Sequence, residues 1–497
     1  MLAMAENTHD DAYLVSDKTI QAPPDSLWKA LTKIGPGIIL AGSIVGSGEL
    51  LLTTGLGADY GFVFLWLILF SCVIKVFVQI ELGRYAISSG KPTLTALDSL
   101  PGPRLGTHWI GWWWLIMMLA TIFQLGAMAG GVGQALNLAF PGVSVWLADS
   151  LTGMLPSLAA AIRNRPEHPW AILTAFSAVL LLLWGGYKRI ELITTILVAG
   201  VTLVTVICVA LLPSTGFPFR MSDLQDGFSL KILGLSGLAI SAAFSTFGIT
   251  GVGASELFAY PYWCLEKGYA RFTGPQSDDP AWAKRARGWM RVMVLDAWVS
   301  MIVFTVATVA FYILGATVLH RQGLHPEKSK MIETLSMMYV PAFGKWTQLF
   351  FLIGAWAVLF KTLYVSSAGN GRLLADFVGL TKAVNYAGRP ELRKQWIRRF
   401  SISLPIIGLV LYLMWGDPKM MVIIGGFFQA ATLPIISGAA LYLRYYRTDQ
   451  RLAPSRWSDA LVWFAFLSIT ACSLYAIPQW AINSLWPAIK PYLVLGP

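Results

Sequence analysis

The chain has 497 residues, of which 56% are hydrophobic and only 13% are charged, and its mean hydropathy is +0.61. A soluble domain carries roughly 25% charged residues, so this composition excludes an ordinary water-soluble protein and predicts a polytopic membrane protein. The formal net charge of +11 could suggest a nucleic-acid partner, but the basic residues lie in loops between apolar segments, and we expect no nucleic acid to bind.

The first 30 residues are polar and predict a cytosolic tail. They lack a basic start followed by an apolar core, so they do not form a signal peptide. The tail carries five acidic residues: Glu6, Asp10, Asp11, Asp17 and Asp25. The remainder, residues 31–497, is expected to form a single membrane transport domain.

Apolar segments of about 20 residues predict about eleven transmembrane helices. They lie near residues 34–57, 61–87, 109–138, 169–186, 190–213, 230–263, 290–316, 346–370, 400–416, 419–443 and 458–478. The order of elements suggests two five-helix repeats, residues 31–213 and 230–446, followed by an extra helix at 458–478.

Lys and Arg accumulate in alternate loops, which predicts the orientation of the chain in the plasma (inner) membrane. If the N-terminus is cytosolic, the basic loops around residues 84–104, 188–189, 267–291, 382–399 and 444–456 all face inward. An odd number of spans then places the C-terminus outside.

Two of the apolar segments are interrupted by glycines that precede a glutamate. Gly46, Ser47, Gly48 and Glu49 follow one another inside the first span, and the stretch from Gly251 to Glu256 interrupts the sixth. A carboxylate is costly in hydrocarbon, and glycine loosens a helix. Paired broken helices in two halves are typical of secondary transporters that bind their substrate midway across the bilayer.

These two breaks supply the candidate binding residues. A broken helix exposes main-chain carbonyls that attract cations, and glutamate adds hard oxygen ligands. We therefore expect Glu49 and Glu256 to be the metal ligands, although either could instead pair with a buried lysine. The predicted substrate-binding set is Gly46, Ser47, Gly48, Glu49, Gly253, Ser255, Glu256 and Leu257.

Two lysines lie deep in apolar segments, Lys75 in the second span and Lys361 in the eighth. Each could extend its ammonium group to the membrane surface. Otherwise each would lie near a carboxylate, where it balances charge or gains and loses a proton during coupling.

The sequence gives no sign of an enzyme. The four cysteines show no paired spacing, no histidine lies within a predicted span, and no nucleophile elbow precedes a helix. We expect no catalytic residues and no cofactor apart from a transported cation, and we expect a monomer whose partners are the lipid bilayer and a small ion or molecule.

Several stretches resemble the natural resistance-associated macrophage protein (NRAMP) family of metal transporters. The first two spans carry most of the resemblance, and shorter matches lie in the third and tenth spans and between the fourth and fifth. The matching residues are Gly35-Pro36-Gly37, Gly61-Phe62, Leu65-Trp66, Ser71, Gln79, Arg84, Leu136-Asn137-Leu138 with Phe140, Gly186 to Glu191, and Leu433-Pro434. The resemblance implies an all-α LeuT-type fold, with two inverted five-helix repeats and broken helices one and six.

The chain departs from the family at its metal-binding motifs. The Asp-Pro-Gly-Asn motif of the first span aligns with residues 46–49, and the Met-Pro-His motif of the sixth span aligns with residues 257–259. The acidic pair of the third span falls on Leu125 and Met128, and the glutamine of the tenth span falls near Gly426. The chain is thus similar to a divergent, NRAMP-related branch.

Replacing a soft methionine by a second carboxylate favours a hard divalent cation such as Mg²⁺ or Mn²⁺. The expected function is secondary-active cation transport by alternating access. The alternative is a small organic substrate, an amine or amino acid, on the same fold. In that alternative a lysine lies near the usual ion site, and Lys361 is the candidate by resemblance.

Overall fold

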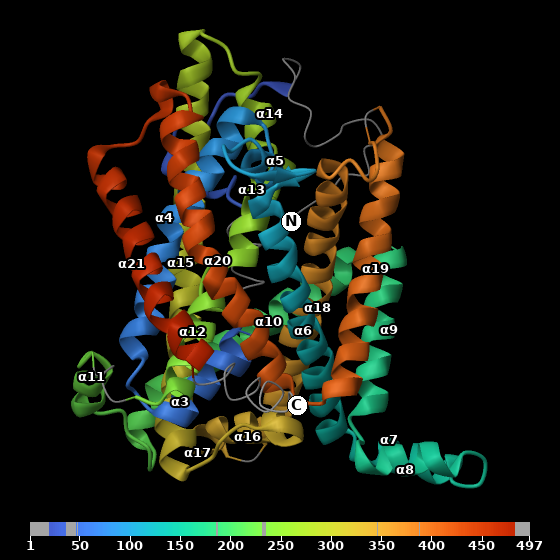
Figure 1. Cartoon of the computed structure of the whole chain (residues 1–497). Helices are drawn as coiled ribbons and strands as arrows, with labels where there is room; N and C mark the ends of the chain where they lie inside the picture. The colour runs from blue at the N-terminus through green and yellow to red at the C-terminus, as the bar shows by residue number, and fades with distance from the viewer. Residues whose placement is uncertain are drawn as a thin grey trace, which may run out of the picture.

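The computed structural model describes residues 19–35, 46, 48–184, 187–230, 235–344, 346–386 and 388–482, with the main chain alone at 184, 187–193 and 329. The predicted tail up to residue 18 lies outside the described residues, and so do Ser47 and residues 36–45 of the first predicted span. The described chain is helical apart from a short hairpin of β1 (Arg104–Leu105) and β2 (Thr107–His108) (Figure 1).

Long helices run side by side between the two ends of the molecule (Figure 1). They are α4 (Leu65–Ser89), α6 (Trp109–Ala139), α9 (His168–Trp184), α10 (Tyr187–Leu211), α12 (Gly237–Ile249) with α13 (Ala254–Lys267), α15 (Pro280–Leu314), α18 (Thr347–Leu380), α19 (Pro390–Trp415), α20 (Pro418–Tyr446) and α21 (Arg456–Trp480). Each overlaps one predicted span from the second to the eleventh.

Shorter elements connect these helices or cover their ends. They are α1 (Leu27–Leu31), a π-helix at Gly48–Thr53 with α3 (Thr54–Tyr60), α5 (Thr93–Asp98), α7 (Pro141–Leu151), α8 (Pro156–Asn164), α11 (Met221–Gly227), α14 (Tyr269–Thr273), a π-helix at Gly315–Leu319, α16 (Met331–Ser336) and α17 (Val340–Phe343).

Nine helical segments among the described residues are long and apolar enough to cross a membrane, or ten if the bent pair α8 and α9 counts as one. The prediction of about eleven also counted the segment 34–57, much of which is not described. Several helices extend beyond the predicted limits because hydropathy detects only the apolar part of a helix. For example, α15 begins ten residues early, where Asp279 caps it and Pro280 occupies its first turn.

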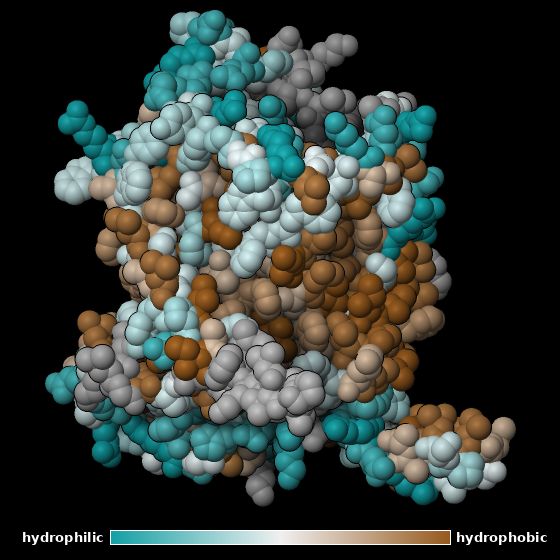
Figure 2. All heavy atoms as spheres, in the orientation of Figure 1, coloured by the Kyte–Doolittle hydropathy of each residue, from teal (hydrophilic) through white to brown (hydrophobic). Residues whose placement is uncertain are grey.

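The membrane-facing surface is apolar around the middle of the molecule. Figure 2 shows a band of apolar atoms with polar atoms above and below it. Inside, α6 packs against α18, α19 and α20, and α15 packs against α4. Close approach of the helices relies on small residues, since a side chain at Gly248 of α12 would collide with the main chain of Gly426 in α20.

A buried ionic cluster joins α4, α20 and α21 near one end of the bundle. The Arg444 guanidinium lies 3.0 Å from the Glu81 carboxylate and 2.5 Å from that of Asp459. Arg84 pairs with Glu81 at 3.2 Å and donates a hydrogen bond to the Leu452 carbonyl oxygen. The Glu81 side chain is only 1% exposed, so its charge depends on these two arginines.

At the same end, the loop before α21 holds the loop before α15. Arg451 donates hydrogen bonds to the carbonyl oxygens of Ser277 and Asp278 and lies over the Trp282 ring. Hydrogen bonds from Arg451 lower the pKa of the Asp449 carboxyl to about 2. This carboxylate therefore stays ionised at neutral pH and becomes protonated only in strong acid.

The α7–α8 hairpin projects sideways from the bundle (Figure 1). The exposed apolar side chains of this hairpin are Val143, Val145, Trp146, Met154, Leu155 and Leu158. Figure 2 shows apolar atoms on the side of the hairpin that is turned towards the apolar band. An ion pair of 2.8 Å between Arg163 and Asp149 joins its two helices.

Candidate functional site

The predicted interruption of the sixth span is a real break between α12 and α13. Residue Thr250 ends α12 in an extended conformation, and Gly251 follows with φ of +66°, which glycine adopts without strain. A side chain at Gly251 would also come within 3.0 Å of the Cys72 Cα. Helix α13 then begins after Gly253, with Glu256 in its first turn, where the helix dipole favours a negative charge.

Glu49 is enclosed beside this break. It lies in the π-helix that begins at Gly48, and it is fully buried. Its carboxylate oxygens accept hydrogen bonds of 3.4 Å from the main-chain N–H groups of Gly46 and Gly251 and from the Thr308 hydroxyl. The structure therefore brings the two predicted glutamates to one break and gives them different surroundings.

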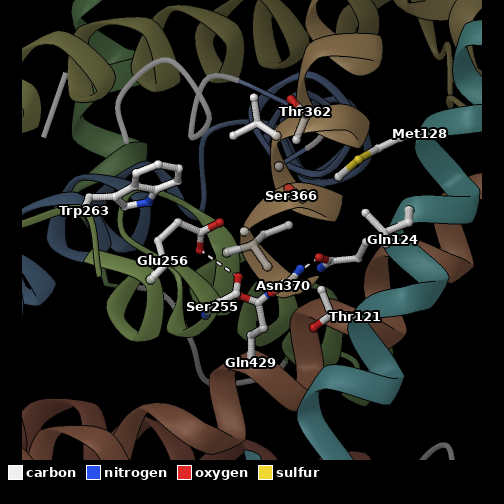
Figure 3. A pocket seen from close by; sticks show the side chains of 16 residues that line it. Thr121, Gln124, Met128, Ser255, Glu256, Trp263, Thr362, Ser366, Asn370 and Gln429 are labelled. Carbon is white, nitrogen blue, oxygen red and sulfur yellow. Dashed lines mark hydrogen bonds between the residues drawn. The ribbon is translucent and has the colours of Figure 1, made fainter. Parts of the chain in front are cut away.

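A cavity of about 70 Å³ lies on the Glu256 side of the break. It is large enough for more than one water molecule. Its lining comes from five parts of the chain, and Figure 3 labels ten of the lining residues. The lining residues are Gly48, Thr121, Gln124, Leu125, Met128, Ile249, Ser255, Glu256, Ala259, Trp263, Thr362, Val365, Ser366, Gly369, Asn370 and Gln429.

A chain of hydrogen bonds crosses the cavity wall from α13 to α20 and α6 (Figure 3). The Ser255 hydroxyl lies 3.0 Å from the Glu256 carboxylate and 2.9 Å from Oε1 of Gln429. The Ser255 N–H donates to the same Gln429 oxygen, and this fixes the amide orientation, since an N–H can only donate. Nε2 of Gln429 then donates to Oε1 of Gln124 at 3.0 Å.

This chain places three oxygen atoms side by side, those of Glu256, Ser255 and Gln429. The Ser255 hydroxyl has one hydrogen but faces two acceptors, one on Glu256 and one on Gln429. A cation satisfies such a cluster of lone pairs, because hard cations take carboxylate, hydroxyl and amide oxygens as ligands. The geometry therefore suits a positively charged ligand beside Glu256.

The structure places the predicted site residues in different surroundings. Gly48 and Ser255 line the cavity with Glu256, whereas Glu49 does not. Gly46 and Gly253 lie beside it, each near a glutamate carboxylate. Leu257 is buried in the hydrophobic core and is not brought to the cavity, because it lies on another side of α13. Ser47 lies outside the described residues.

The two predicted lysines are both buried and lie in different places. Lys75 is fully buried on α4, and its Nζ donates to the main-chain carbonyl oxygens of Phe247 and Thr250, at 2.6 Å and 2.5 Å. Lys361 on α18 is 7% exposed and donates to the Thr195 hydroxyl of α10 at 3.0 Å. Lys75 is thus at the break in the sixth span, and neither lysine extends to the surface of the molecule.

Sequence reasoning missed most of the polar lining. Thr362, Ser366 and Asn370 recur every four residues and so share one face of α18, a pattern that was visible in the sequence. Gln124 and Gln429 are isolated amides in apolar segments, which was a second available signal. Gln429 lies three residues after Gly426, the position near which the family's glutamine was expected to fall.

The lining also corrects one chemical expectation. From the sequence we expected no sulfur ligand, because the methionine of the family's sixth-span motif is absent from this chain. The structure nevertheless brings Met128 of α6 to the cavity (Figure 3). A thioether can accept soft metals. The expected preference for hard cations therefore depends on the number of oxygen atoms rather than on an absence of sulfur.

The sequence profile of the natural resistance-associated macrophage protein-like (Nramp-like) family matches residues 37–479. The chain belongs to this family. Nramp-like proteins are transporters rather than enzymes, and the resemblance noted in the sequence is confirmed. The match runs through both predicted breaks and all the lining residues, so the cavity lies inside the family's shared domain.

Curated relatives of this Nramp-like protein are distant. It is 22% identical over 483 residues to the divalent metal cation transporter MntH of Latilactobacillus sakei, and the match covers 93% of both chains. It is 26% identical over 140 residues to MntH of Yersinia pestis, which covers 28% of this chain and 33% of that protein.

Solved structures show that the fold is LeuT-like, as predicted. A mutant of the Eremococcus coleocola manganese transporter superposes with a TM-score of 0.60 at 17% identity, covering 94% of this chain and 92% of that one. MhsT in complex with L-phenylalanine gives a TM-score of 0.56 at 14% identity, covering 92% and 99%. Mhp1, a nucleobase-cation-symport-1 family transporter, gives 0.51 at 14%, covering 91% and 93%.

Proposed function

We propose that this Nramp-like protein moves a divalent metal cation across the membrane by alternating access, and that the cation is a hard one such as Mg²⁺ or Mn²⁺. The observation that carries the proposal is the oxygen cluster of Glu256, Ser255 and Gln429, which brings a carboxylate, a hydroxyl and an amide oxygen together at the cavity. The names of the MntH relatives, as divalent metal cation transporters, support the same cargo class.

In this proposal Glu256 is the principal ligand. Ser255 and Gln429 supply neutral oxygens, and Glu49 lies behind the break, outside the cavity lining, where it accepts a hydrogen bond from the Gly251 N–H. The cavity volume of about 70 Å³ suits an ion that keeps part of its water shell, because Mg²⁺ loses its waters reluctantly. Gly46, Gly48 and Gly253 would form the main-chain surroundings of the ion.

Transport in reconstituted liposomes tests the cargo. We expect Glu256→Gln to reduce Mn²⁺ binding and uptake at least about tenfold, because a charged ligand becomes a neutral one. Gly200→Ala is the control, since Gly200 does not line the cavity and a methyl group there meets no atom within 4 Å. Mn²⁺ uptake by Glu256→Gln equal to that of the wild type would sink the proposal. A Cd²⁺ affinity that falls on Met128→Leu would show that the cargo is soft rather than hard.

An organic cation is the second candidate, and one observation favours it. A single carboxylate, Glu256, faces the cavity together with the Trp263 ring. A carboxylate beside an indole is suited to a singly charged amine. Thermal-shift screening separates the two candidates, because stabilisation by an amine and by no divalent ion would favour the amine.

We keep the predicted orientation as part of the proposal, with the N-terminus cytosolic and the C-terminus outside. In the same way, we propose repeats at residues 31–213 and 230–446 with an extra helix at 458–478. Lys361 is proposed to balance charge or couple transport to a proton from its place between α18 and α10. A monomer is the proposed state.

A further inference from the structure

One peptide group at the break contacts two buried charges of opposite sign. The carbonyl oxygen of Thr250 accepts a hydrogen bond of 2.5 Å from the Lys75 ammonium group. The N–H of Gly251 belongs to the same peptide group and donates to the Glu49 carboxylate at 3.4 Å. Lys75 and Glu49 are both fully buried, so each needs a compensating partner.

The Lys75 ammonium also lies on the carbonyl end of α12. It donates to the Phe247 carbonyl oxygen at 2.6 Å and lies 5.1 Å from the centre of the Phe247 ring. The C-terminal end of a helix carries unpaired carbonyls and a partial negative charge. Lys75 therefore occupies the place at this break where a free cation would otherwise find main-chain oxygens.

The orientation of this peptide group is set by its neighbours. The φ of +66° at Gly251 turns the N–H towards Glu49, and close contact with Cys72 leaves no room for a side chain. The Ser71 hydroxyl lies 3.2 Å from both carbonyl oxygens that Lys75 contacts. Ser71 thus shares the contacts of Lys75 but carries no charge.

We propose that Lys75 and Glu49 form an ion pair relayed by the Thr250–Gly251 peptide group, so that Glu256 alone sets the charge that the cavity offers to its cargo. The inference rests on the proposed function in one respect, namely that the cargo is a cation. It makes Lys75 a specificity-determining residue, since removing its charge would leave the Glu49 charge uncompensated beside the cavity.

The proposal fixes the sign of each variant's effect on Mn²⁺ affinity. Glu49→Gln leaves an unbalanced positive charge, so the dissociation constant should rise about tenfold or more. Lys75→Gln leaves an unbalanced negative charge, so the constant should fall. The double variant restores the balance, and its constant should return to within about threefold of the wild type. A Glu49 that binds the cargo directly predicts no such recovery.

Two matched variants distinguish charge from contact. In the Glu49→Gln background, Lys75→Arg keeps the positive charge, and Ser71→Ala removes a contact to the same carbonyl oxygens without changing charge. Neither should restore affinity. If Mn²⁺ affinity recovers with Lys75→Gln and with neither of the other two substitutions, the relayed ion pair is supported. Equal recovery with Lys75→Gln, Lys75→Arg and Ser71→Ala overturns it, and so does a double variant whose loss of affinity is the sum of the two single losses.

The midpoint of thermal unfolding in detergent, measured without metal, tests the ion pair independently of the cargo. Each single variant leaves a buried charge unpaired and should lower the midpoint, and the double variant should lie above both. If the wild type binds no divalent ion, the proposed function fails while this comparison still decides the ion pair. A double variant that unfolds at or below the lower single midpoint would overturn the pair even where Mn²⁺ binds.

Discussion

At the level of single residues, the site depends on Gly253, which has no Cβ atom. A Cβ there would lie 2.5 Å from the Glu256 carboxylate and 2.8 Å from Oε1 of Gln429. Both distances are shorter than ordinary contact. The glycine therefore allows the carboxylate and the amide to approach the start of α13 together.

We expect Gly253→Ala to reduce cation binding by about tenfold or more, because the added methyl group pushes Glu256 and Gln429 out of position. Isothermal titration with Mn²⁺ measures the effect. Gly200→Ala is the control, since a Cβ at Gly200 meets no atom within 4 Å. Unchanged binding by Gly253→Ala would mean that these two side chains do not hold the ion.

Single residues were predictable where charge in an apolar segment made them conspicuous. This signal identified Glu49, Glu256 and Lys75, because a charged side chain is costly in hydrocarbon and usually has a function there. The neutral amides Gln124 and Gln429 gave a weaker signal. That Glu49 is enclosed while Glu256 faces the cavity depends on packing between helices distant in sequence, which no local pattern contains.

At the level of elements, helices far apart in the sequence are joined by buried charge. Arg444 of α20 contacts Glu81 of α4 and Asp459 of α21, and its side chain is 6% exposed. Removing Arg444 would leave the buried Glu81 carboxylate with Arg84 alone and would take away the arginine partner of Asp459. The cluster therefore holds three helices in one arrangement at this end of the bundle.

We expect Arg444→Met to lower the free energy of unfolding by about 3 kcal/mol or more. The measurement is the unfolding midpoint in detergent. Lys394→Ala removes an exposed ion pair with Glu391 and should cost at most about 1 kcal/mol. If the two variants unfold alike, the cluster contributes little to stability.

The long helices were predictable because each needs an apolar stretch to cross the bilayer. The ends of these helices were less predictable, because a helix can continue through charged turns beyond its apolar part, as at the start of α15. The α7–α8 hairpin was missed altogether. Its helices are too short to span a membrane, and they therefore gave no signal in a search for spans.

At the level of the whole molecule, the cavity leads towards one end of the bundle. A smaller second cavity lies between α13 and α18, and it shares Ala259, Trp263 and Gly369 with the first. An ion pair of 3.0 Å between Arg372 and Glu266 borders it. In the proposed orientation this end faces the cytosol.

A cysteine at Ala259 should report this path. Cys72, Cys208 and Cys264 are buried, and Cys472 is half-buried, so a Cys472→Ser background should react little. We expect Ala259→Cys to be modified by a small charged thiol reagent from the proposed cytosolic side, and saturating Mn²⁺ should slow the reaction several-fold. Faster labelling from the opposite side would reverse the direction of the path.

The sideways hairpin of α7 and α8 has a practical consequence for purification. The hairpin projects beyond the helical bundle (Figure 1), and its exposed Trp146 and Met154 side chains add apolar surface there. A detergent micelle or nanodisc that is only as wide as the helical bundle would leave the α7–α8 hairpin at its edge. A wider scaffold ring, with lipid to spare on that flank, is the better choice for reconstitution.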